Sequence, residues 1–70
     1  MKVKCLSNSR SSARDLTVGK VYSASKLIYG SYEANGNLVN REDAIKLIDD
    51  VGDTVYTAIL LGFEVIGDDL

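Results

Sequence analysis

One segment, DTVYTAI at residues 53–59, limits most strongly what this chain can fold into. It is rich in β-branched and aromatic residues, which is typical of a strand. A strand needs a hydrogen-bonded neighbour, and the nearest candidate lies before it, across the turn Asp50-Val51-Gly52-Asp53. A glycine in the left-handed conformation would suit such a turn. The flanking strand therefore favours a hairpin.

Local rules alone also allow a helix in the segment that precedes this strand. Asn40 could cap it with Asp43 at the third position, and an apolar stripe would end at Gly52. As a hairpin strand, Ile45 and Leu47 alternate instead. Short apolar runs do not separate the two structures, so helix and hairpin strand both stay open for residues 41–51.

Two further strands are expected before this point. Residues 1–7 alternate, with Met1, Val3 and Cys5 on one face. Residues 16–29 form the second strand, with Gly19 as a turn or bulge at its start. One face of it carries Val21, Ser23, Ser25 and Leu27, and the other carries Tyr22, Ala24, Lys26 and Ile28. A last strand over residues 61–66 and an acidic tail at 67–70 complete the chain.

Asn35-Gly36 is a strong signal for a tight turn, because both central positions need positive φ angles. It predicts an extra β-ribbon over residues 27–39. The alternatives are a short helix between residues 30 and 44, or a loop or lid over residues 30–43.

These elements predict a mainly β fold in a single domain, residues 1–70. Five or six short strands cannot cover both faces of a flat sheet, so we expect a small, partly open barrel. A chain of this length buries only roughly 60% of its unfolded surface. The expected core consists of Val3, Cys5, Leu16, Val18, Val21, Leu47, Val55 and Phe63.

The segments MKVKCLSN, LTVGKVY, IKLIDDVGDTVY and FEVI resemble the small SH3-like barrel proteins encoded in many bacteriophage genomes. The resemblance touches both ends and the middle of the chain and implies an SH3-like barrel, a phage context and the host cytoplasm. Residues 7–15 correspond to the variable loop of that family, and the 29–43 segment is longer than the usual connection. Most members have no assigned function, so function is argued from sites.

Catalytic and metal chemistry are poorly supported. The chain has no histidine, and its single cysteine, Cys5, is expected to be a packing residue. Asp49, Asp50 and Asp53 form a cluster that turn formation explains. We therefore predict no enzyme activity, no metal site and no cofactor. No apolar run approaches about 18 residues, so no membrane span is expected.

Charge is divided unevenly along the chain. Residues 1–26 carry six basic side chains and one acid, a balance of +5, whereas residues 27–70 carry two basic side chains and nine acids, a balance of −7. The net charge of −2 argues against duplex nucleic acid as a partner, because that partner requires a broad basic surface. The net negative charge is nevertheless compatible with a compact basic patch that binds a smaller anion.

The run SNSRSSARD at residues 7–15 is the predicted anion-binding loop. Hydroxyl, amide and guanidinium donors suit a phosphate, and a tyrosine ring near them would stack a base. The predicted ligand is a nucleotide-like molecule, such as a cyclic nucleotide signal of host defence. The predicted ligand-binding residues are Asn8, Ser9, Arg10, Ser11, Ser12, Arg14, Lys20, Tyr22, Tyr29 and Tyr32.

A protein-binding role is the alternative. The run AILLGF at residues 58–63 is apolar in a domain with little interior, so part of it would face a host protein or a second copy. Exposed strand edges would serve the same purpose.

Overall fold

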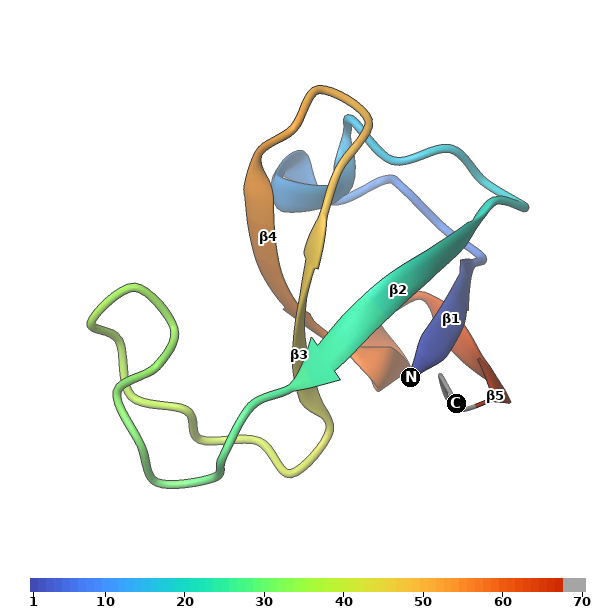
Figure 1. The fold of residues 1–70 in the computed structure, drawn as a ribbon. Coiled ribbons are helices and arrows are strands. Elements are labelled where there is room, and N and C mark those ends of the chain that lie inside the picture. Colours follow the sequence, from blue (N-terminus) through green and yellow to red (C-terminus); the bar gives the residue numbers. More distant parts are fainter. Residues whose placement is uncertain (68–70) are drawn as a thin grey trace.

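The structure, a computed structural model, describes residues 1–67, with the side chain of Ser12 outside the described part. Five antiparallel strands form one unclosed sheet in the order β4-β3-β2-β1-β5 (Figure 1). Two short 3-10 helices, η1 and η2, are the helical elements among these residues. The mainly β prediction is therefore confirmed. The bounds are β1 Lys2–Cys5, η1 Ser11–Ala13, β2 Val21–Lys26, β3 Ala44–Ile48, β4 Thr54–Ala58, η2 Ile59–Leu61 and β5 Phe63–Gly67.

Strand β2 joins the two halves of the sheet. Its first half pairs with β1, with Val3 opposite Tyr22, and its second half pairs with β3, with Ala24 opposite Leu47. This division lets the sheet curl around one core while β4 and β5 remain its two edges.

The core fills the inner face of the curled sheet. Val3, Cys5 and Ile45 are fully buried at its centre. The cluster consists of Val3, Cys5, Ala13, Leu16, Tyr22, Ala24, Ile45, Leu47, Val55 and Phe63. Six of the eight predicted core residues therefore lie in it.

The other two core predictions are wrong. Val18 is 53% exposed because it lies in the turn that the Lys20 N–H closes on the Thr17 carbonyl. Val21 is 45% exposed because Tyr22 and Ala24 occupy the inner face of β2, and alternation sends Val21 outward. The predicted core requires the Val21 face of this strand to lie inside, whereas in the structure the Tyr22 face lies inside.

Residues 44–58 form a hairpin, so the helical alternative is excluded there. Leu47 pairs with Val55, and the Asp49 N–H donates to the Asp53 carbonyl at 2.9 Å. Gly52 closes the turn with a φ of +91°, the left-handed conformation predicted for it.

The 27–43 loop contains neither a helix nor a full ribbon. The predicted Asn35-Gly36 turn is present, with φ angles of 54° and 84°, but a single bridge, Ala34 to Asn37, flanks it. The loop instead folds over one end of the sheet and buries Leu27 and Val39 against Ala44. Leu27 follows β2 and continues its alternation on the outer face of the sheet. The small cluster around it therefore covers part of that outer face.

The last strand begins later than predicted. Residues 59–61 form η2, and Gly62 turns the chain with a φ of +141° before Phe63 starts β5. In the predicted apolar stripe, Ala58 and Phe63 are buried and Leu60 is 82% exposed. Gly67 belongs to β5, and the rest of the predicted acidic tail, residues 68–70, lies outside the described residues.

Candidate functional site

The 7–15 loop holds its polar side chains partly in internal hydrogen bonds. The Asn8 amide donates to the Leu16 carbonyl at 2.9 Å, and the hydroxyls of Ser7 and Ser9 lie 3.1 Å apart. Ser11 is exposed in η1, and the side chain of Ser12 lies outside the described part. Asn8 and Ser9 therefore help to shape the loop.

The two arginines of this loop are exposed, and Arg14 lies close to an acid. The Arg14 guanidinium lies 3.8 Å from the Asp15 carboxylate. The Asp50 N–H donates to the Asp15 carbonyl at 3.1 Å, which places the 49–53 turn at the same end of the molecule. An anion bound by Arg10 and Arg14 would thus also lie near the negatively charged aspartates of this turn. Their repulsion would weaken the electrostatic attraction of the arginines for the anion.

Lys20 and Tyr22, two predicted ligand-binding residues, are engaged by Asp50. The Lys20 ammonium and the Tyr22 hydroxyl donate to Asp50 Oδ1 at 2.7 and 2.9 Å, and the Thr17 hydroxyl donates to Oδ2 at 2.6 Å. These donors, Lys20 first, then Thr17 and Tyr22, lower the pKa of Asp50 to about 2. The same pairing raises the pKa of Lys20. The contacts of Asp50 with Thr17, Lys20 and Tyr22 therefore connect the β3–β4 turn to the start of β2.

Tyr29 and Tyr32 lie far from the arginines. Both belong to the 27–43 loop and are 62% and 68% exposed. Figure 1 shows this loop at the opposite end of the molecule from η1. The structure therefore divides the predicted ligand-binding residues between two ends.

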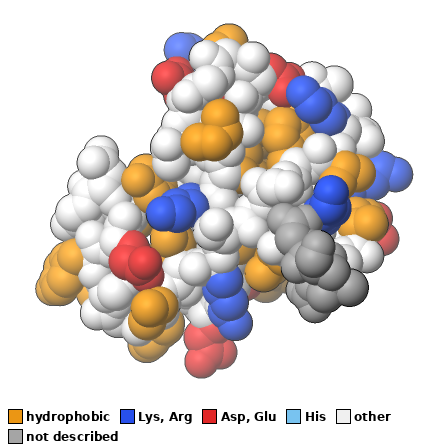
Figure 2. Space-filling model, viewed as in Figure 1, with side chains coloured by type: hydrophobic (Ala, Val, Ile, Leu, Met, Phe, Trp, Pro, Cys, Tyr) orange, Lys and Arg blue, Asp and Glu red, His pale blue; other side chains and the backbone are white. Residues whose placement is uncertain are grey.

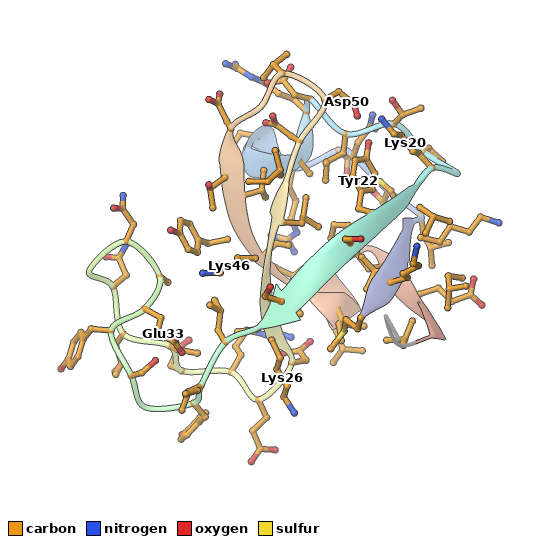
Figure 3. All side chains as sticks on the ribbon, in the orientation of Figure 1. Lys20, Tyr22, Lys26, Glu33, Lys46 and Asp50 are labelled. Carbon is orange, nitrogen blue, oxygen red and sulfur yellow. The ribbon has the colours of Figure 1, made fainter. Side chains whose placement is uncertain are left out.

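The outer face of the sheet carries a groove that the sequence interpretation did not identify. We call it the polar groove: a cavity of about 250 Å³ across β2, β3 and β4. Ser25 pairs with Lys46, and Lys46 pairs with Tyr56, so the three side chains form one row across the strands. Figure 3 shows Lys46 leaving β3 on the side of the 27–43 loop. The lining residues are Ser23, Ser25, Lys46, Leu47, Ile48, Thr54 and Tyr56.

The polar side chains of the groove make no hydrogen bond or ion pair to protein groups among the described residues. Within residues 1–67, no hydrogen bond or ion pair engages the side chains of Ser23, Ser25, Lys46, Thr54 or Tyr56. Four hydroxyls and one ammonium group therefore face a shared space with their hydrogen-bonding capacity free.

The lining of the groove carries one positive charge, that of Lys46, and no acid. In Figure 2 the acidic side chains lie mostly at the periphery of the viewed face. The acid that interacts with Lys46 is Glu33, whose pKa is lowered chiefly by the Ile28 N–H and then by Ser31, with a smaller contribution from Lys46. Glu33 is thus mainly held by its own loop.

The sequence contains a signal for this groove. Ser23 and Ser25 share one face of β2 with Val21. In the sequence interpretation, Val21 belongs to the core, and this assignment directs the whole face, with both serines, toward the interior. With Tyr22 and Ala24 directed inward, the two serines fall on the outer face beside Lys46.

Comparison with known proteins gives no relative from which a site could be transferred. No family model, curated protein or solved structure matches the chain.

Metal ligands and membrane spans are not seen in the described part. Within residues 1–67, no group of three or more acidic, cysteine or histidine side chains could hold a metal ion. No helix there is long and apolar enough to cross a bilayer. The pKa of Cys5 is raised, chiefly by burial, which disfavours the reactive thiolate.

Proposed function

We propose that this protein is a non-enzymatic, SH3-like barrel of the kind encoded by bacteriophages, which captures a phosphate-bearing ligand in the host cytoplasm. The ligand is a nucleotide or cyclic nucleotide, and its capture would lower the concentration of a host defence signal.

The observation that carries this proposal is the set of free donors in the polar groove. A phosphate over the Ser25–Lys46 pair would accept charge-assisted hydrogen bonds from Lys46 and further bonds from Ser23 and Ser25. Tyr56, one strand away, is 37% exposed and offers a ring on which a base would stack. Such stacking is worth roughly 1–3 kcal/mol per base.

The fold supports the SH3-like part of the proposal. Five antiparallel strands curl around one core, with left-handed glycines at the turns of residues 19 and 52, and this arrangement is compatible with a small SH3-like barrel. The sequence motifs that resemble the phage proteins supply the expectation of phage origin and host cytoplasm.

A binding role fits the groove better than catalysis. The residues that line it include no carboxylate, thiol or imidazole to act as a general base. The groove can hold and orient an anion, and its residues provide no second group to activate a nucleophile.

Isothermal titration calorimetry against mononucleotides, cyclic di- and trinucleotides and short oligonucleotides tests the proposal. We expect at least one nucleotide to bind, and Lys46→Met to weaken it at least tenfold. The matched control, the Arg10→Ala, Arg14→Ala double variant, removes the two exposed charges of the 7–15 loop and should leave affinity within twofold. If the double arginine variant loses nucleotide binding and Lys46→Met does not, the binding site lies in the 7–15 loop and not in the polar groove.

Protein binding is the second candidate, favoured by the 82% exposure of Leu60 in η2. Leu60 lies in η2, which contacts the edge strand β5, and an exposed strand edge can accept a strand from a host protein. Absence of binding to every nucleotide, together with a host protein whose capture is abolished by Leu60→Ser, would support this alternative.

A further inference from the structure

We propose that this protein forms a symmetric dimer through the end of β2 and the start of the 27–43 loop. The surface is an apolar hollow of about 510 Å³, lined by Lys26, Leu27, Ile28, Tyr29 and Glu42. The hollow shares no lining residue with the polar groove, so the two surfaces are distinct.

The hollow belongs to a well-ordered part of the loop. The Gly30 N–H donates to the Val39 carbonyl at 2.7 Å, and the Val39 N–H donates to the Ser31 carbonyl at 2.8 Å. The Ile28 N–H donates to the Glu33 carboxylate at 2.7 Å. These bonds fix the backbone of the loop from which Ile28 and Tyr29 project.

Two large apolar side chains are consecutive and exposed on this surface. Ile28 is 67% exposed and Tyr29 is 62% exposed, although Leu27 beside them is buried. Figure 2 shows hydrophobic side chains on the surface of the lobe formed by this loop. Exposed apolar groups grouped in this way are typical of an interaction surface.

The charges of the hollow indicate what covers it. Lys26 and Glu42 both line it, and within residues 1–67 neither has an ion pair. A twofold axis through the hollow would place Lys26 of one copy against Glu42 of the other, twice, around Ile28 and Tyr29. Such mutual pairing is the pattern of a closed C2 interface. The surface is thus complementary to itself.

The hollow is small, with five lining residues. Specific interfaces bury roughly 600 Å² per partner at their smallest, so we expect a weak, concentration-dependent dimer.

Sedimentation velocity across a concentration series tests this interface through charge reversal. We expect dimers of the unmodified chain, loss of dimers at equal concentration in Lys26→Glu and in Glu42→Lys, and their return in the double variant. Arg10→Glu, the same charge change at the far end of the molecule, should leave dimers intact. Circular dichroism confirms that each variant is folded.

A strictly monomeric chain at millimolar concentration would overturn the proposal. Dimers that survive both single reversals, or a double variant that remains monomeric, would also overturn it. Binding of a different protein that Ile28→Ser abolishes, with the chain itself monomeric, would assign the hollow to that partner.

Discussion

Tyr22 and Asp50 are 28 residues apart in the chain, and the Tyr22 hydroxyl donates to the Asp50 carboxylate at 2.9 Å. The same hydroxyl accepts the Thr17 N–H at 2.8 Å. A buried ring of the core thus ends in a polar contact that fixes the β3–β4 turn on the start of β2.

Removal of the Tyr22 hydroxyl should weaken the fold. Because Tyr22→Phe keeps the buried ring, the loss is that of hydrogen bonds, about 1 kcal/mol of unfolding free energy. For a domain of this size this lowers Tm by roughly 4–8 °C. Tyr56→Phe removes a hydroxyl with no partner among the described residues and should leave Tm unchanged. Equal Tm values for the two variants would contradict this account.

Stability should fall in acid. The folded-state pKa values of Asp43 and Asp50 are both about 2, below the ordinary 3.8. Arg41 and the Leu60 N–H hold Asp43 in its ionised form, and Lys20, Thr17 and Tyr22 hold Asp50. Groups with depressed pKa values stabilise the fold above the unfolded-state pKa and lose this contribution as the pH falls through the folded-state value. Urea midpoints should therefore decrease from about pH 4 to pH 2.

The Asp50→Asn variant isolates one of these groups. It should be less stable than the unmodified chain at about pH 7 and should lose less stability between about pH 4 and pH 2, because one of the two carboxylates is absent. If the urea midpoint of Asp50→Asn falls between about pH 4 and pH 2 as steeply as that of the unmodified chain, Asp50 does not contribute to the loss of stability in acid.

Two glycine substitutions should differ in cost. Gly52 has a φ of +91°, and a Cβ added there would meet no heavy atom within 4 Å. Gly52→Ala therefore costs only backbone strain, about 1–2 kcal/mol. At Gly62, with a φ of +141°, the added Cβ would also lie 3.1 Å from the Ser7 carbonyl oxygen. We expect Gly62→Ala to give the lower urea midpoint, and the reverse order would contradict the close contact at Ser7.

The Cys5 thiol should be unreactive in the folded protein. It is fully buried in β1, and burial raises its pKa. A chromogenic disulfide reagent should modify it at the rate of chain opening, and rapidly once urea unfolds the chain. Immediate modification without urea would place Cys5 outside the core.

The glycine turns and most of the core are predictable because they depend on local signals, whereas the hairpin is favoured over a helix only through the strand that follows it. Asp50, Gly52 and the alternation of Ile45 and Leu47 act within a few residues of one another. The face of β2 is not predictable in this way. One face carries Val21, Ser23 and Ser25 and the other carries Tyr22, Ala24 and Lys26, so each mixes apolar and polar residues. The pairing with β1 and β3 decides which face is buried.

The candidate site is less predictable for the same physical reason. Lys20 and Tyr22 are ligand donors in the sequence interpretation, but the fold brings Asp50 to them across 28 or more residues. Ser25, Lys46 and Tyr56 become one row only after three strands pair. Composition indicates a basic patch, and topology determines where free donors gather.

The most direct test of the polar groove is an amide NMR titration of the labelled protein with adenosine 5′-monophosphate and, separately, with adenosine. We expect the monophosphate to shift the signals of Ser23, Ser25, Lys46 and Tyr56, adenosine to shift them less, and Lys46→Met to remove the difference. Shifts confined to residues 8–14, or equal shifts with and without the phosphate, would contradict a phosphate site in the groove.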